Sequence, residues 1–356
     1  MEYFLDPLDY INVYHYSLMI VLLLCYTKSL SDKSSQGLNF IVMALFYILI
    51  VFIGFRPVSW SAFGDMGSYA RNYVSFKSYY DIEVFESDFL FYFIMSLFSK
   101  LSIPIGFYFT TMYVLYSAPL LIFSKKHFRK MWPYAFLMFL SFFEYFSYAT
   151  NGIRNGIACS MFILALSFPK NKLLRNLFLI ISVSFHFSLI IPVSGYFIYI
   201  YFQKIKYFIV FWFSALIISF FSGNFFISFF NQFFTERTNH YFTSQEDVIY
   251  KTGFRIDFIL YSFIGVLASY FYLYKKEFKC EFYNKLVAVF LFSNALWLLV
   301  IRANFSNRIA YLSWFILAPV IIYPLLKTKL LKYQFSRICL IILFFFSISL
   351  YLNILR

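Results

Sequence analysis

The sequence has little of what disulfide-bonded, metal-binding or secreted proteins use. Its 356 residues include four cysteines, none spaced as C-x-x-C, so we expect neither disulfides nor a thiolate zinc site. Charged residues make up only 13% of the chain. Residues 1–10 are acidic rather than basic, and nothing resembling a cleavage site follows the first apolar run, so we expect no secretory signal peptide.

Apolar residues fill the chain instead. They make up 62% of it, and the mean hydropathy is +0.73. A soluble domain has too small an interior to bury that much apolar surface, whereas a membrane span needs roughly 20 apolar residues in a row. Candidate spans lie at about 11–27, 38–55, 103–123, 133–149, 152–168, 177–202, 207–222, 254–274, 285–301, 309–326 and 338–355. We therefore predict an all-α, polytopic integral membrane protein with about 11–12 transmembrane helices in a single domain over residues 1–356.

The links between spans predict the orientation, because lysine and arginine accumulate on the cytoplasmic side. Six links are basic, and placing all of them inside puts the N-terminus outside, with longer outer loops at about 56–87 and 223–253. Two segments strain this scheme. We interpret 88–101 as an interfacial or re-entrant helix on the outer face, and 177–202 as a broken pair of half-spans around His186 and Pro192.

Lysine and arginine divide unequally across the membrane. The six inner links contain 16 Lys, 3 Arg and 3 acidic residues, while the remainder contains 3 Lys and 8 Arg. The net charge of +14 is thus a topology signal, and we expect no nucleic-acid partner. Arginine suits phosphate through paired hydrogen bonds. An Arg-rich outer face therefore predicts an anionic ligand such as a lipid diphosphate, with structural ion pairs as the alternative.

The first outer loop mixes aromatic and polar residues. It contains Trp60, then Gly64-Asp65 and Tyr69, then Arg71. Rings stack on the apolar faces of sugars while polar groups take the hydroxyls, so Asp65, Tyr69 and Arg71 are candidate sugar-binding or structural residues. The alternative is an aromatic belt at the membrane interface.

Two further segments carry candidate catalytic residues. Arg154 lies between two spans in Asn151-Gly-Ile-Arg154-Asn-Gly156, with Glu144 as a plausible counter-ion or structural partner. His186 lies deep in an apolar stretch and is a candidate general base, although a satisfied core histidine is the alternative. His240, in the second outer loop, is the reserve candidate for the base.

Three more arginines are candidates for binding a diphosphate. Arg255 opens a span together with Asp257, and the two side chains are expected to pair. Arg302 and Arg308 bracket a short outer turn. We expect these three residues to ring one outward cavity with Arg154.

In this order, the segments resemble those of the EpsG-like polysaccharide polymerases, relatives of the Wzy-type O-antigen polymerases. The resemblance covers about residues 50–325. It rests on Gly64-Asp65…Tyr69, Asn151-Gly-Ile-Arg154-Asn-Gly-Ile-Ala158, Ser184-Phe-His186-Phe-Ser188, Gly253-Phe-Arg255-Ile-Asp257 and Asn307-Arg308-Ile-Ala-Tyr311. Met66-Gly67-Ser68 departs from the more polar filling expected after Asp65.

The resemblance implies a GT-C-like membrane glycosyltransferase of the bacterial cytoplasmic (inner) membrane, with its active site facing outward. It would join repeat units carried on undecaprenyl diphosphate, both donor and acceptor, into O-antigen or a related surface polysaccharide. The transfer would be inverting and use neither metal nor cofactor; the partners would be membrane lipid and a chain-length regulator protein. The alternatives are a lipid-linked oligosaccharide flippase, a membrane O-acetyltransferase and a ligase that transfers glycan to lipid A. The sequence shows no internal repeat of the transporter kind.

Overall fold

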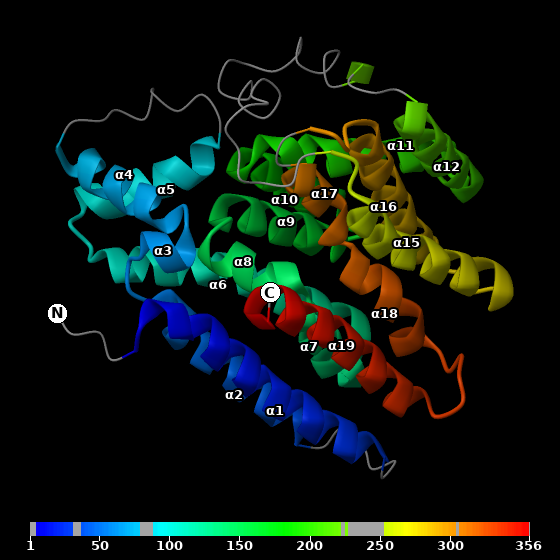
Figure 1. Ribbon diagram of the computed structural model, residues 1–356, viewed down its shortest axis with the longest axis horizontal. Coiled ribbons are helices and arrows are strands. Elements are labelled where there is room, and N and C mark those ends of the chain that lie inside the picture. Colours follow the sequence, from blue (N-terminus) through cyan, green and yellow to red (C-terminus); the bar gives the residue numbers. More distant parts are fainter. Residues whose placement is uncertain are drawn as a thin grey trace. The chain divides into compact units, whose positions relative to one another are not determined.

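The described part of the chain folds almost entirely as helices (Figure 1). The computed structural model describes residues 5–30, 37–78, 88–221, 225–226, 253–303 and 306–355, and these contain no strand. Six helices in this part of the chain have the length and composition to cross a membrane, and five shorter apolar helices accompany them. The predicted all-α polytopic membrane protein is confirmed, while the number of crossings stays a prediction.

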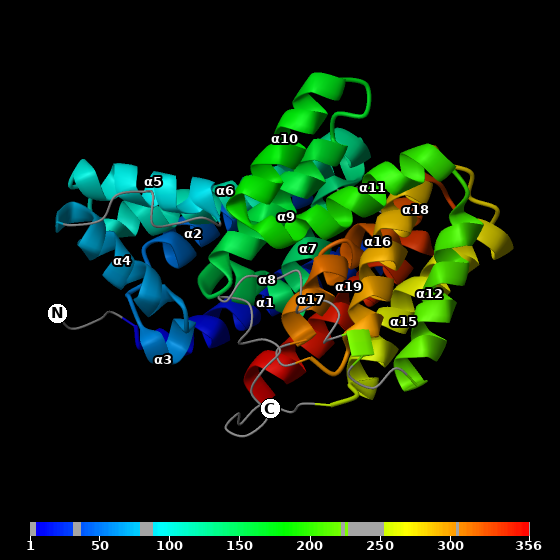
Figure 2. The same ribbon diagram turned by 90° about the horizontal axis from the view of Figure 1, so that it is seen from above.

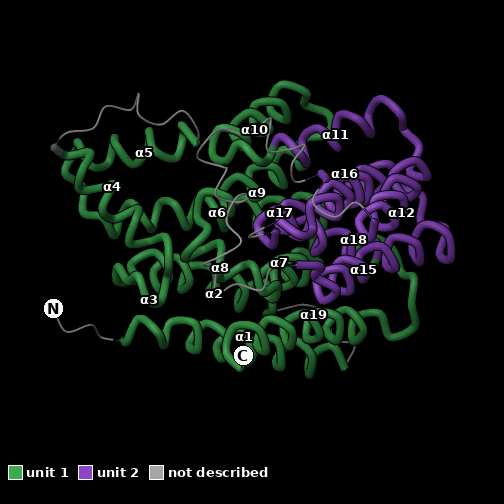
Figure 3. The backbone as a smooth tube through the Cα atoms, turned by 45° about the horizontal axis from the view of Figure 1, so that its top comes forward, with its two compact units in different colours: residues 1–189, 325–356 green, residues 190–324 purple. Residues whose placement is uncertain are grey.

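The helices form two compact units, which are coloured separately in Figure 3. Unit 1 comprises residues 1–189 and 325–356, and unit 2 comprises residues 190–324. Whether they make one membrane domain, as expected, stays a prediction. The helices of unit 1 are α1 (Tyr10–Leu30), α2 (Leu38–Gly54), α3 (Trp60–Phe63), α4 (Met66–Ser78), α5 (Phe89–Lys100), α6 (Ile105–Phe128), α7 (Trp132–Ser141), α8 (Phe143–Thr150), α9 (Ile153–Leu166), α10 (Lys172–Phe185) and α19 (Gln334–Leu350).

Helix α9 lies at the centre of unit 1 and packs against α6, α8 and α10 (Figure 2). All of its residues from Gly156 to Leu166 are buried in an unbroken run. An apolar helix that is buried all round is a core helix. Packing of this helix therefore holds its N-terminal end in place, and Arg154 lies in the first turn.

Unit 2 is held together by a buried polar network as well as by apolar packing. Its helices are α11 (Ile190–Phe202), α12 (Ile205–Phe221), α15 (Ile256–Tyr270), α16 (Glu281–Leu299), α17 (Ser306–Trp314) and most of α18 (Leu317–Lys327). Asn294 on α16 accepts from Trp212 at 2.8 Å and donates to Ser262 and Ser313 at 2.9 Å. Side-chain amides and hydroxyls that bond across helices in this way link helices where apolar burial alone distinguishes little between packings.

Three predicted spans are broken in the structure. The stretch 133–149 divides at Phe142, which is extended, and Tyr14 donates to the nearby carbonyl of Leu140 at 2.6 Å. The stretch 309–326 divides between α17 and α18, where Pro319 has no N–H to give the carbonyl four residues earlier. The stretch 177–202 divides at His186, and Pro192 lies within α11. The predicted break around His186 is confirmed.

The outer loop predicted at 56–87 contains two helices, α3 and α4, and its residues 79–87 lie outside the described part of the chain. The 12-residue α5 matches the predicted helix at 88–101 and is about 18 Å long, well short of a bilayer core. Its placement at the outer face stays a prediction. The second predicted loop, 223–253, lies outside the described residues except at 225, 226 and 253, and so does His240.

Candidate functional site

The break after α10 presents the side chain of His186. This residue caps the helix in an extended conformation, and its N–H donates to the carbonyl of Ser182 at 3.2 Å. A short 3-10 helix, Phe187–Leu189, follows directly. Because the backbone leaves the helical conformation at this residue, the imidazole does not continue the helical array of side chains on α10.

Arg154 occupies the second position of α9, after the turn at Asn151 and Gly152. Gly156 allows close packing here, because a Cβ atom at that residue would lie 2.8 Å from Cβ of Tyr148 and 3.0 Å from its carbonyl oxygen. The glycine thus lets the start of α9 lie against α8.

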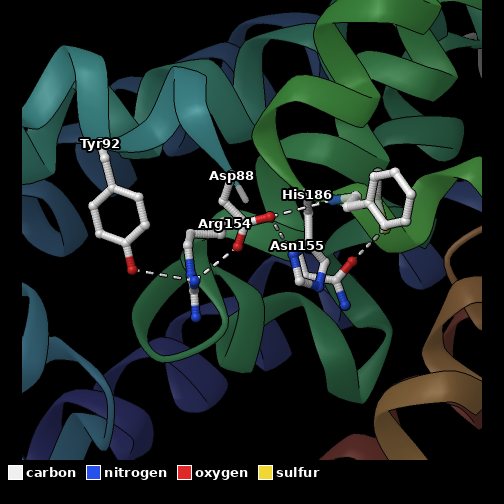
Figure 4. A network of polar contacts seen from close by, with 7 residues as sticks. Asp88, Tyr92, Arg154, Asn155 and His186 are labelled. Carbon is white, nitrogen blue, oxygen red and sulfur yellow. Dashed lines mark hydrogen bonds and ion pairs between the residues drawn. The ribbon is translucent and has the colours of Figure 1, made fainter. Parts of the chain in front are cut away.

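Asp88 joins these two residues, and sequence reasoning did not single it out (Figure 4). One carboxylate oxygen lies 2.7 Å from Nη1 of Arg154, and the other lies 3.0 Å from Nδ1 of His186. The backbone N–H of Phe187 donates to the second oxygen at 3.2 Å. Asp88 adopts a left-handed conformation (φ 61°) at the N-cap of α5 without capping the helix with its side chain, so the carboxylate is turned to Arg154 and His186 instead.

The three side chains differ in burial. The carboxylate of Asp88 is only 4% exposed, whereas the side chains of Arg154 and His186 are 28% and 30% exposed. Burial alone would raise the pKa of Asp88, but the hydrogen bond and charge of His186, with the charge of Arg154, hold that pKa below its ordinary value. Asp88 is therefore an anion at neutral pH, covered by two partners that remain open on their other side.

Both partners keep hydrogen-bonding capacity for a ligand. His186 uses Nδ1 for Asp88, and within the described residues Nε2 makes no protein hydrogen bond. Arg154 donates from Nη1 to both Asp88 and the hydroxyl of Tyr92, the latter at 3.3 Å, and it also hydrogen-bonds Tyr69, which leaves part of its five N–H donors unused among the described residues. A base with one free nitrogen thus lies beside a guanidinium with unused donors.

The motif that contains Asp65 and Tyr69 lies beside the motif that contains Arg154. The N–H of Asp65 donates to Oδ1 of Asn151 at 2.8 Å, and the side chain of Asn151 also contacts Gly64, where φ is 48°. Tyr69 is 3% exposed, packs on Phe91 and has the guanidinium of Arg154 5.7 Å from its ring centre. The buried ring of Tyr69 therefore packs beside the guanidinium of Arg154, while Asp65 lies at a turn that contacts Asn151, just before α9.

Glu144 does not form the expected pair with Arg154. The salt bridge of Arg154 is with Asp88, and Glu144 is buried in the first turn of α8, with 4% of its surface exposed. The break at Phe142 makes Glu144 begin a new helix rather than end a span, which changes the position expected from the sequence. The expected Glu144–Arg154 pair is therefore wrong, and the counter-ion is Asp88.

In unit 2, the predicted diphosphate-binding residues Arg255 and Arg302 are committed to protein partners. Arg255 pairs with Asp257 through two hydrogen bonds of 2.9 and 2.6 Å, as expected. Arg302 donates to the carbonyls of Ser219 and Phe220 in the last turn of α12, at 2.6 and 3.4 Å. Arg308 is exposed on α17. The single arginine-lined cavity that was to include Arg154 stays a prediction.

The comparisons with known proteins bear on this arrangement. No curated protein and no solved structure gives a significant match to the chain. A family model does match, over residues 39–356, and it takes in Arg154 and His186 as well as Asp88. A match over nearly the whole chain shows membership: the chain belongs to the EpsG family, whose members are Wzy-like polymerases.

Proposed function

We propose that this protein polymerises oligosaccharide repeat units carried on undecaprenyl diphosphate, at the outer face of the bacterial cytoplasmic membrane. The observation that carries the proposal is the single buried carboxylate that holds Arg154 and His186 side by side, each with donors or acceptors to spare. The product would be O-antigen or a related surface polysaccharide.

His186 would act as the general base. Its Nδ1 faces Asp88, which favours the tautomer with the proton on Nδ1 and leaves the lone pair of Nε2 for an acceptor hydroxyl. The proton of that hydroxyl passes to Nε2 as its oxygen bonds to the anomeric carbon of the donor. The bond from that carbon to the phosphate oxygen breaks, and the electron pair leaves on the diphosphate, which inverts the anomeric centre in one displacement.

Arg154 would stabilise the negative charge that grows on the departing diphosphate. Donors that are already fixed where charge develops lower a barrier more than flexible ones do. The ion pair with Asp88 and the rings of Tyr69 and Tyr92, 5.7 and 5.8 Å from the guanidinium, fix Arg154 in this way.

The test is genetic complementation of a deletion strain with wild type, His186→Gln, Arg154→Gln and Asp88→Asn, followed by gel analysis of surface polysaccharide. The control is Glu281→Gln, which breaks an ion pair whose carboxylate is 78% exposed. We expect the deletion to leave single repeat units in place of a long-chain ladder. The first three variants should fail to restore the ladder at normal membrane levels, and the control should restore it.

Other outcomes favour the alternatives. Absence of any repeat unit from the surface would favour a flippase or a ligase. An intact ladder that has lost an acyl group from each repeat would favour an O-acetyltransferase. A ladder restored in full by His186→Gln would exclude His186 as the base.

A further inference from the structure

Within residues 56–73, a described part of the segment that the sequence marked for sugar binding, one aromatic ring is exposed. Trp60, the first residue of α3, is 52% exposed. Phe63, Tyr69 and Tyr73, the other aromatic residues between 56 and 73, are at most 8% exposed. The ring that a ligand from solution can reach is therefore the indole of Trp60 rather than the phenol of Tyr69.

The indole is held flat against α4. A Cβ atom at Gly67 would lie 2.0 and 2.1 Å from the two fusion atoms of the indole and 2.3 Å from its nitrogen, so the backbone of Gly67 meets the face of the ring. The guanidinium of Arg71 lies 4.6 Å from the ring centre. Gly67 and Arg71 are four residues apart on one helix face, so both lie beside the indole, and with 52% of Trp60 exposed much of the ring stays accessible.

The surroundings of this ring are polar and rigid. Ser59 caps α3 by accepting from the N–H of Ala62 at 3.2 Å, and its hydroxyl lies 3.1 Å from that of Ser61. Arg71 is exposed beside the ring. A fixed aromatic face among hydroxyls and a guanidinium suits a sugar, which offers C–H groups on its face and hydroxyls at its edge; a lipid tail would use only the ring.

The indole of Trp60 lies on the opposite side of α4 from the Asp88 cluster. Tyr69, which lies under Arg154, projects from the face of α4 away from Gly67 and Arg71. A helix with its side chains is about 10 Å across, a separation that one or two sugar rings span. We propose that Trp60 stacks on a sugar of the glycan or repeat unit, one or two residues from the bond that is made. This inference rests on the proposed function.

The experiment measures binding separately from polymerisation. Wild-type protein in nanodiscs is titrated with the repeat-unit oligosaccharide freed by mild acid from the carrier lipid of the deletion strain, and contact is followed by ligand-observed NMR. We expect binding to weaken about threefold to tenfold in Trp60→Ala. Gly67→Ala, which pushes the ring off α4, should weaken it comparably, and Trp60→Phe less. The control is Phe107→Ala, because Phe107 is also 52% exposed.

The outcomes separate this inference from the function. His186→Gln should bind the oligosaccharide like wild type, yet leave no ladder. Equal binding by wild type and Trp60→Ala would overturn the inference while leaving the polymerase intact. A Trp60→Ala protein that binds normally but accumulates less in the membrane would overturn it too, because loss of an interfacial aromatic would have that effect.

Discussion

Breaking the Asp88–Arg154 pair should cost far more stability than breaking an exposed pair of the same length. The two atoms are 2.7 Å apart, and the carboxylate is 4% exposed. Removing one partner of a fully buried pair costs about 3–5 kcal/mol, because the other charge stays buried. Arg154 keeps 28% exposure, and an asparagine can still accept a hydrogen bond, so we expect about 2 kcal/mol for Asp88→Asn.

A double-mutant cycle isolates the pair from other effects. Asp88→Asn, Arg154→Gln and the double variant are unfolded in mixed micelles, and the coupling free energy is expected at about 1–2 kcal/mol. The matched control is Glu281–Lys285, also 2.7 Å apart but with a carboxylate 78% exposed, where coupling should stay below about 0.5 kcal/mol. Equal coupling in the two pairs would refute the reasoning that burial strengthens the Asp88 pair.

Three further predictions follow from other contacts. Because the pKa of Asp88 is lowered, its contribution to stability is complete above about pH 4 and is lost as pH falls through the lowered pKa. The melting temperature measured between about pH 3 and 6 should therefore fall toward low pH, and Asp88→Asn should make it depend less on pH. Asn294→Leu should lower the free energy of unfolding by about 1–3 kcal/mol, since it leaves the indole N–H of Trp212 unpaired, and an unchanged melting temperature would contradict this. Arg302→Met should cost about 1–2 kcal/mol through the lost carbonyl contacts in α12 while the ladder persists; a lost ladder at full stability would favour a diphosphate-binding role instead.

The fold class was predictable because bilayer physics acts on composition and run length. Apolar runs and lysine-bearing links are local properties, so the helices, and even the break at His186, followed from the chain. The breaks at Phe142 and near Pro319 were harder, because an apolar run reads the same whether its helix is continuous or broken. Hydropathy measures affinity for lipid and carries no information on backbone angles at a single residue.

The site was predictable only in part. Arg154 and His186 stood out because a polar side chain in an apolar run needs a partner. The partner itself, Asp88, is 66 residues from Arg154 and 98 residues from His186 along the chain. It lies in an acidic stretch, where nothing in the sequence sets one acidic residue apart from the others. Its signal was its place immediately before the apolar run 89–98, where an acid precedes the first turn of a helix. Glu144 was chosen instead because it is close to Arg154 in sequence.

The most direct measurement of the central claim is transfer by purified protein. Wild type and His186→Gln in nanodiscs are mixed with the undecaprenyl-diphosphate-linked repeat unit extracted from the deletion strain, and both glycan length and free undecaprenyl diphosphate are followed. We predict that wild type lengthens the glycan and releases one carrier for each bond, and that His186→Gln is slower by about 10²–10⁴-fold. Wild type that releases no carrier, or His186→Gln that lengthens the glycan at the wild-type rate, would contradict the account.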